Sequence, residues 1–201
     1  MILAGGAASR YGGRPKGLEQ VGGRRVIDRV ADALAEAADD LLLIANDPAA
    51  RDWLPQVPMA GDVRLNCGSL GGIHAAIVRA GRPVLVVAWD MPFVPPGLLR
   101  MLRDVGAHAD AVLPESGSRR GLEPLCAYYS TTCLPAIERR LDANDMRVIS
   151  FFEDVRVERL SARDVRRFGD PAVLFMNVNS PDDLAIAERY AADGVHRRPE
   201  A

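Results

Sequence analysis

The first sixteen residues constrain the fold more than any other stretch of this chain. Three apolar residues, Met1 to Leu3, predict the end of a buried strand, and a loop with four glycines follows them. The charged residues of this loop are the cations Arg10, Arg14 and Lys16, and the first acid is Glu19. Because glycine lets a backbone approach a ligand closely and turn its N–H groups inward, the loop is suited to a polyphosphate. A solvated basic connection is the alternative.

The strand before this loop is unusually short, because a buried parallel strand has about five or six residues. Either the strand is short in the folded protein or the native chain begins upstream of Met1. The 201 residues, 48% hydrophobic and 26% charged, suit one large globular domain. We expect a domain over residues 1–192, followed by a polar tail at 193–201.

Composition also narrows the partners and the compartment. A formal net charge of -2 favours neither bulk nucleic-acid binding nor binding to an acidic membrane. No apolar run reaches membrane-spanning length, and no export signal is recognisable at the N-terminus. The cysteines (Cys67, Cys126 and Cys133) are odd in number and lack CxxC spacing, so no disulfide framework or zinc site is indicated. The sequence therefore predicts a reduced, cytoplasmic protein with no nucleic-acid or membrane partner.

Apolar patterning predicts alternating strands and helices. Apolar runs indicate strands at 1–3, 41–45, 57–60, 84–89, 111–114, 124–129, 155–160 and 173–176. Helical spacing and capping signals indicate helices at 26–37, 95–105, 131–141, 147–153 and 181–192. A second glycine-rich loop at 67–73 opens a further helix that runs to about Ala80. A tight turn at Gly22-Gly23 joins two further short strands. This order predicts an α/β fold with a mostly parallel, mixed central sheet flanked by helices, and an antiparallel strand in its later part.

In an open parallel sheet, ligands bind beyond the carboxyl ends of the strands. The chain places polar residues there as well as the first glycine loop: Asn46, Asp62, Asp90, Asn177 and Asn179. A basic glycine loop, two acids and several amides at one edge resemble a nucleotide–Mg²⁺ site. Magnesium takes few carboxylates and several phosphate oxygens, which suits Asp90 as its principal ligand. The alternative for Asp90, a helix N-cap, fits poorly because the next helix begins only at Pro95 or Pro96.

The other polar residues at this edge also have structural alternatives. Asp62 follows a glycine and Asn46 precedes Asp47-Pro48, so either could simply form a turn. Asn177 and Asn179 lie two apart on an extended stretch and share a face, where they could bind a ligand or hold the turn before Ser180.

Several common site motifs are absent from the sequence. It contains neither GxxxxGK[ST] nor GxGxxG after the first strand, so a P-loop and a dinucleotide fold are not supported. No spacing suggests a Ser-His-Asp or Cys-His set. We expect His74 to be a capping or surface residue rather than a catalyst.

Four motifs together resemble the molybdenum cofactor guanylyltransferase (MobA) family. Leu3-Ala4-Gly5-Gly6 with Ser9-Arg10-Tyr11-Gly12-Gly13-Arg14-Pro15-Lys16 resembles the family signature LAGGxSxRMGxxK. The segments that resemble its GPLAGI, CDMPF and NxNTPEDL motifs are residues 68–73, 89–93 and 177–184. The departures are Tyr11 for Met, Pro15 where Asp is common, Ser69 for Pro, and Trp89 at a position that is usually small.

The resemblance implies a single-domain Rossmann-like nucleotidyltransferase fold of the GT-A-like kind that uses GTP and Mg²⁺. It implies transfer of GMP from GTP to the phosphate of molybdenum-bound molybdopterin, which gives molybdopterin guanine dinucleotide and pyrophosphate. Molybdoenzyme apoproteins and an accessory protein of cofactor biosynthesis are the further partners it suggests.

Site residues follow from the resemblance by position. Lys16 would contact the phosphates and Asp90 would hold the magnesium ion. The guanine and ribose would be bound by Leu3, Ala4, Gly5 and Gly6, with help from Asn46 and Asp62. Asn177, Asn179 and Pro124-Leu125 would face the pterin.

The chemistry needs no protein base, because a phosphate monoester has a second pKa of about 6 and is largely anionic at neutral pH. Catalysis would come from charge neutralisation and in-line positioning by Mg²⁺, Lys16, Arg10 and backbone amides. The alternatives are a molybdopterin cytidylyltransferase, a phospholactate guanylyltransferase or a sugar-phosphate nucleotidyltransferase. A non-catalytic protein that delivers cofactor is an alternative of a different class.

Overall fold

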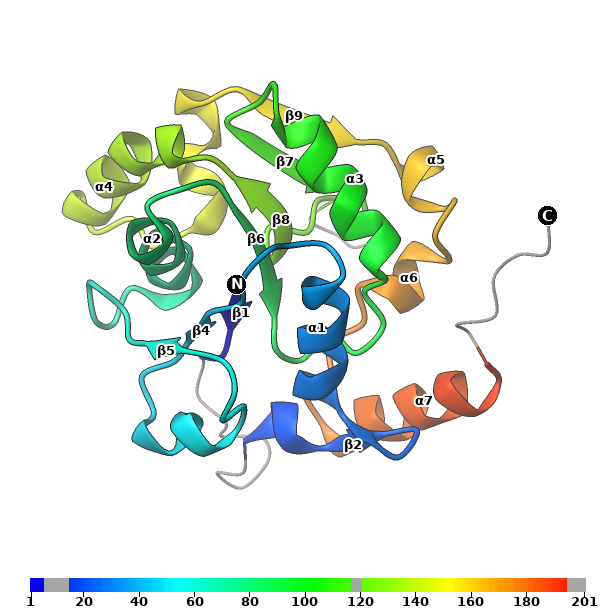
Figure 1. Ribbon diagram of the computed structural model, residues 1–201. Helices are drawn as coiled ribbons and strands as arrows, with labels where there is room; N and C mark the ends of the chain where they lie inside the picture. The colour runs from blue at the N-terminus through cyan, green and yellow to red at the C-terminus, as the bar shows by residue number, and fades with distance from the viewer. Residues whose placement is uncertain (6–14, 117–120, 195–201) are drawn as a thin grey trace.

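A computed structural model of the protein describes residues 1–5, 15–116 and 121–194 (Figure 1). Its centre is a seven-stranded sheet with the order β5-β4-β1-β6-β8-β7-β9. The strands are β1 (Ile2–Leu3), β4 (Leu43–Ile44), β5 (Met59–Ala60), β6 (Val84–Ala88), β7 (Ala111–Pro114), β8 (Cys126–Tyr129) and β9 (Val157–Leu160). The predicted hairpin is also present, with β2 (Gln20–Val21) paired to β3 (Arg24–Arg25).

The sheet is mixed, as predicted. β1 pairs in parallel with both β4 and β6, and β4 pairs in parallel with β5. β8 is the antiparallel strand, since it runs against β6 on one side and β7 on the other. From β1 the chain moves outward through β4 to β5 and then returns to place β6 on the other side of β1. The order of strands therefore reverses between β1 and β6, which is where open α/β sheets form ligand crevices.

Helices cover both faces of this sheet (Figure 1). α1 (Val26–Ala35) and α3 (Pro96–Gly106) lie on one face, and α2 (Gly68–Ala80) and α4 (Leu134–Asp142) lie on the other. β6 shows why both faces need cover. Leu85 and Val87 belong to the core beneath α1 and α3, whereas Val84 and Val86 belong to the core beneath α2 and α4. Successive side chains of a strand point to opposite faces of the sheet, so a strand that is buried on both faces must be apolar at every position. The apolar run at 84–88 meets this requirement.

A third, smaller core anchors the C-terminal helix. α7 (Pro181–Ala192) packs through Ala187 against Val21 of β2 and against Phe93 and Val178. Its start is the predicted one, because the Ser180 side chain accepts a hydrogen bond from the backbone N–H of Asp183 at 3.2 Å. This packing fixes the segment before α7, which carries Asn177 and Asn179.

The strand predicted at 173–176 is wrong. The structure has a short helix there, α6 (Pro171–Leu174), and no strand in that segment. Asp170 caps the helix by accepting a hydrogen bond from the N–H of Ala172 at 3.0 Å, and Pro171 occupies the first helical position. A four-residue apolar run does not distinguish a buried strand from a buried helix, and the cap before it is what decides.

Other boundaries shifted without changing the architecture. The predicted helix at 131–141 begins as a 3₁₀ turn, η4 (Thr131–Cys133), before α4, and the helix predicted at 147–153 is the 3₁₀ segment η5 (Val148–Asp154). Two 3₁₀ segments, η2 (Lys16–Leu18) and η3 (Pro48–Asp52), and the short helix α5 (Ala162–Val165) were not predicted.

The cysteines are all free and buried. Burial raises the pKa of the Cys133 thiol to about 12, and it also raises the pKa of Cys126. Burial therefore disfavours the thiolate, which is the nucleophilic form of cysteine, at both positions. In the described ranges, the helices are too short or too polar to cross a membrane.

Candidate active site

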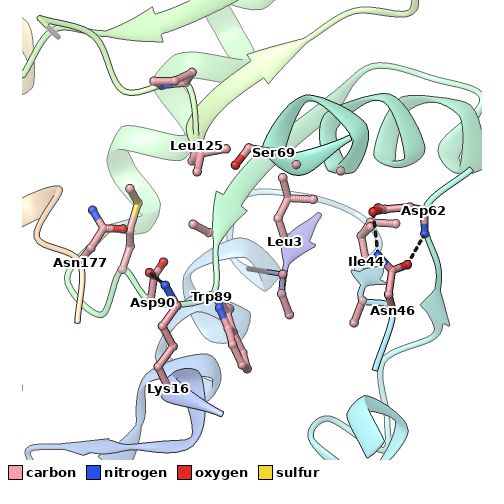
Figure 2. A pocket seen from close by; sticks show the side chains of 18 of the residues that line it. Leu3, Lys16, Ile44, Asn46, Asp62, Ser69, Trp89, Asp90, Leu125 and Asn177 are labelled. Atoms are coloured by element: carbon pink, nitrogen blue, oxygen red, sulfur yellow. Dashed lines mark hydrogen bonds and ion pairs between the residues drawn. The ribbon is translucent and has the colours of Figure 1, made fainter. Parts of the chain in front are cut away.

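A cleft of about 680 Å³ opens at the carboxyl ends of β1, β4 and β6 (Figure 2). Its walls come from segments that are far apart in the chain: residues 3–5 after β1, Lys16, Asn46 after β4, 88–91 after β6, and 177–179 before α7. This is the crevice that the reversal of strand order predicts.

An ion pair lies at one side of the cleft. The Nζ of Lys16 is 2.5 Å from Oδ2 of Asp90 and donates a second hydrogen bond to Oδ1 of Asn179 at 2.6 Å. The carboxylate of Asp90 is nearly buried, with 6% of its side chain exposed, whereas Lys16 retains 19%. The ammonium of Lys16 is therefore the more accessible member of the pair, and the carboxylate of Asp90 is largely enclosed by the protein.

Backbone contacts explain why residues distant in sequence meet here. The N–H of Val178 donates to the carbonyl of Asp90 at 2.9 Å, which fastens the segment before α7 to the end of β6. The side chain of Asn177 then folds back to donate to the carbonyl of Phe175 at 3.1 Å, and the side chain of Asn179 reaches Lys16. The two amides line the same cleft, as their spacing predicted.

The backbone next to Lys16 is packed tightly, because Gly17 lies against the ring of Trp89. A Cβ atom on Gly17 would lie 2.4 Å from Cε3 of Trp89, so only glycine fits there. The 3₁₀ turn η2 that follows is closed by a hydrogen bond from the N–H of Leu18 to the carbonyl of Pro15 at 3.0 Å.

The opposite end of the cleft is built from two polar side chains that bind each other (Figure 2). Asn46 donates from Nδ2 to Oδ2 of Asp62 at 2.8 Å, and its Oδ1 accepts the backbone N–H of Asp62 at 2.8 Å. This reciprocal pair joins the ends of β4 and β5, and it is exposed, so it can exchange these partners for a ligand's hydroxyl or ring nitrogen atoms.

The N-terminus of α2 forms a further wall, through Gly68, Ser69 and Gly72. Gly72 lies beside β1, where a Cβ would make an ordinary van der Waals contact of 3.5 Å with Cδ1 of Leu3. Free N–H groups and the helix dipole make such a terminus favourable for an anion. Leu125, just before β8, lies beside Ser69 (Figure 2), and its neighbour Pro124 also lines the cleft.

The predicted site residues that the structure describes all line this cleft, namely Leu3, Ala4, Gly5, Lys16, Asn46, Asp62, Asp90, Pro124, Leu125, Asn177 and Asn179. Arg10 and Gly6 lie outside the described residues. The structure adds Asn66, Met91 and Glu123 to the lining. Glu123 and Met91 directly adjoin predicted residues in sequence, which is a signal that could have found them.

His74 is not the surface or capping residue predicted. It lies within α2 and is 2% exposed, with its Nε2 3.3 Å from Oε1 of Glu138 on α4. It packs between two helices, and it does not line the cleft.

The cleft also fits a divalent metal ion. Asp90 offers a carboxylate at one side of the cleft, and the ammonium of Lys16 already occupies a cation's place on its Oδ2. Magnesium is commonly bound through one or two carboxylates together with substrate phosphates, so Asp90 and a triphosphate would suffice to hold it.

Taken together, the doubly wound sheet, the cation beside a buried carboxylate and the helix N-terminus define a protein that handles a phosphorylated nucleotide. Comparison with known proteins gives the particular family. Residues 1–158 match the model of the MobA-like NTP transferase domain, and the chain belongs to this family of nucleotidyltransferases.

Relatives agree over nearly the full chain. A molybdenum cofactor guanylyltransferase from Desulfosudis oleivorans is 36% identical over 191 residues, covering 94% of this chain and 93% of that protein. A probable molybdenum cofactor guanylyltransferase from Pelotomaculum thermopropionicum is 39% identical over 194 residues, covering 95% and 92%. Among solved structures, molybdopterin-guanine dinucleotide biosynthesis protein A from Archaeoglobus fulgidus superposes with a TM-score of 0.80 at 28% identity, covering 96% and 97%. The predicted family and fold are thus confirmed.

Proposed function

We propose that this enzyme transfers GMP from GTP to the phosphate of molybdenum-bound molybdopterin, forming molybdopterin guanine dinucleotide and releasing pyrophosphate. The observation that carries the proposal is the Lys16–Asp90 pair, 2.5 Å apart within the cleft at the strand-order reversal. The names of the relatives, over nearly the whole chain, support these substrates.

The cleft has two ends that could take the two substrates. Asn46 and Asp62 at one end suit the sugar and base of GTP, together with Leu3, Ala4 and Gly5, which line the same cleft. Asn177 at the other end, together with the lining residues Pro124 and Leu125, suits the pterin. Lys16 and Asp90 lie nearer to Asn177 in Figure 2, where the triphosphate and the attacking phosphate would meet.

The acceptor phosphate is the nucleophile, and its oxygen displaces pyrophosphate from the α-phosphorus of GTP. Lys16 would bind the phosphates and offset the repulsion between the two anions, while Asn179 orients its ammonium. Asp90 would hold Mg²⁺, which when bound supplies charge neutralisation at the phosphate oxygens. Arg10 remains a proposed contributor on the basis of the family motif alone.

A pyrophosphate-release assay with GTP, Mg²⁺ and molybdenum-molybdopterin, omitting each in turn, tests the proposal. We expect release only with all three. Turnover of CTP in place of GTP would indicate a cytidylyltransferase, and turnover with a phospholactate or sugar phosphate in place of the pterin would indicate the corresponding enzyme. Binding of GTP without any release would indicate a delivery protein.

We also propose a cellular compartment and protein partners for the enzyme. We place the enzyme in the cytoplasm, where its free cysteines stay reduced. Molybdoenzyme apoproteins and an accessory protein of cofactor biosynthesis are its proposed protein partners.

A further inference from the structure

The only two tryptophans of the sequence, Trp53 and Trp89, stack on each other beside the cleft. Their ring centroids are 4.8 Å apart and their planes differ by 17°. Trp53 follows η3 in the connection from β4 to β5, and Trp89 follows β6. The stack therefore ties together the loops after two different strands. Both side chains are buried, with exposures of 7% and 4%.

Trp89 also touches the loop that carries the catalytic lysine. Its six-membered ring lies so close to Gly17 that a Cβ there would be 2.4 Å from Cε3 and 2.7 Å from Cδ2. Gly17 is bonded directly to Lys16, so the position of the indole fixes the backbone from which the Lys16 side chain extends. The backbone of Gly17 thus lies directly against the indole, closer than a residue with a Cβ could lie. Gly17 therefore has little room to move toward Trp89.

The indole packs against Trp53 and Gly17. Its Nε1 is buried and has no hydrogen-bond partner in the described parts of the chain. A buried unpartnered N–H is unfavourable, so a ring without that donor would satisfy the same contacts.

We propose that the Trp53–Trp89 stack is a positioning device for Lys16, acting through Gly17. It holds the ammonium where it meets Asp90 and Asn179 and where a triphosphate would bind. The inference rests on the proposed function in one respect, namely that Lys16 binds the phosphates of GTP. Trp89 is thus a positioning residue, because it acts through Lys16.

Equilibrium binding of GTP and guanosine, each with Mg²⁺, tests the proposal without the pterin substrate. We expect W89L to weaken GTP binding by about tenfold, the loss that follows when a hydrogen bond to a charged group is misplaced, and to leave guanosine binding unchanged. W89F keeps a ring against Gly17 and should retain most of the GTP affinity. The matched control is F151L, which shortens a fully buried aromatic residue in the core beneath α2 and α4. F151L should leave both affinities unchanged.

The decisive measurement is a double-mutant cycle with K16A. If Trp89 acts through Lys16, W89L should cause no further loss of GTP affinity in the K16A background. Additive losses, or a W89L protein that loses guanosine and GTP affinity equally, would overturn the proposal. They would make Trp89 a direct ligand contact or a general core residue.

A second double-mutant cycle, between Gly17 and Trp89, tests the same contact without relying on the W89L variant alone. G17A should weaken GTP binding because its Cβ meets the indole, and G17A/W89L should recover part of that loss because the smaller side chain makes room. Absence of recovery in a folded double variant would contradict the proposed route. Wild-type protein that binds GTP no more tightly than guanosine would also overturn it. Tight GTP binding without pyrophosphate release, in contrast, would refute the proposed transfer reaction and leave the positioning role intact.

Discussion

The two ends of the cleft each hold a carboxylate, but in opposite ways. At one end, Asp90 is nearly buried and meets the cation of Lys16 at 2.5 Å. At the other, Asp62 meets the neutral amide of Asn46 at 2.8 Å in an exposed pair. An ion pair in a poorly solvated place is stronger and more sensitive to a change in either partner than a hydrogen bond between a carboxylate and an uncharged amide that is exposed to water. We therefore expect the Asp90 end to control the rate and the Asp62 end to control affinity for the nucleoside.

The largest effect should come from the buried carboxylate. D90A should lower the turnover number by about a hundredfold or more, equivalent to about 3–4 kcal/mol in the barrier, because the Lys16 ammonium and the proposed Mg²⁺ would both lose their partner. Steady-state pyrophosphate release measures it, with circular dichroism to check the fold. Near wild-type release by a folded D90A protein would remove Asp90 from the mechanism.

Removal of the cation should have the next largest effect. K16A loses charge-assisted contacts with phosphate, and we expect the affinity for GTP to fall by about ten- to a hundredfold. Guanosine affinity should stay unchanged, since the proposed nucleoside contacts lie at the other end. Calorimetric titrations with both ligands provide the measurement. Equal losses for both would show that Lys16 is a structural residue and that the two ends are not independent.

Changes to the exposed Asn46–Asp62 pair should have a smaller effect, and this effect should fall on the KM for GTP rather than on kcat. D62A should raise the KM for GTP by up to about tenfold with little change in kcat, because a hydrogen bond made in both ground and transition states is uniform binding. N46A and N46A/D62A complete the cycle, and we expect non-additive losses because the two side chains bind each other. A fall in kcat as large as that of D90A would break the proposed division of labour.

The smallest effect should be that of N179A, which removes one of the two acceptors of Lys16. Loss of this contact should raise the KM for GTP by about two- to tenfold. N177A is the matched comparison, because Asn177 lines the cleft without contacting Lys16 and should instead raise the KM for molybdopterin. The same substrate preference in both variants would place the two amides in one subsite.

The sequence determined much of this protein by local rules. The buried run at 84–88 specified β6, Ser180 with Pro181 specified the start of α7, and polar residues at strand ends predicted the edge at which the cleft opens. These signals depend on neighbours in the chain or on the geometry of parallel sheets, so they can be read from residues alone. The same rules failed at 173–176, where the run of four apolar residues was too short to distinguish a helix from a strand.

Only the tertiary structure decided which of these residues meet. Asp90 and Asn179 converge on Lys16 because the N–H of Val178 binds the carbonyl of Asp90. Trp89, known from the sequence only as a large residue where a small one is common, stacks on Trp53 and contacts Gly17. Such contacts join segments that no local pattern relates, because they arise when helices and loops pack on the completed sheet.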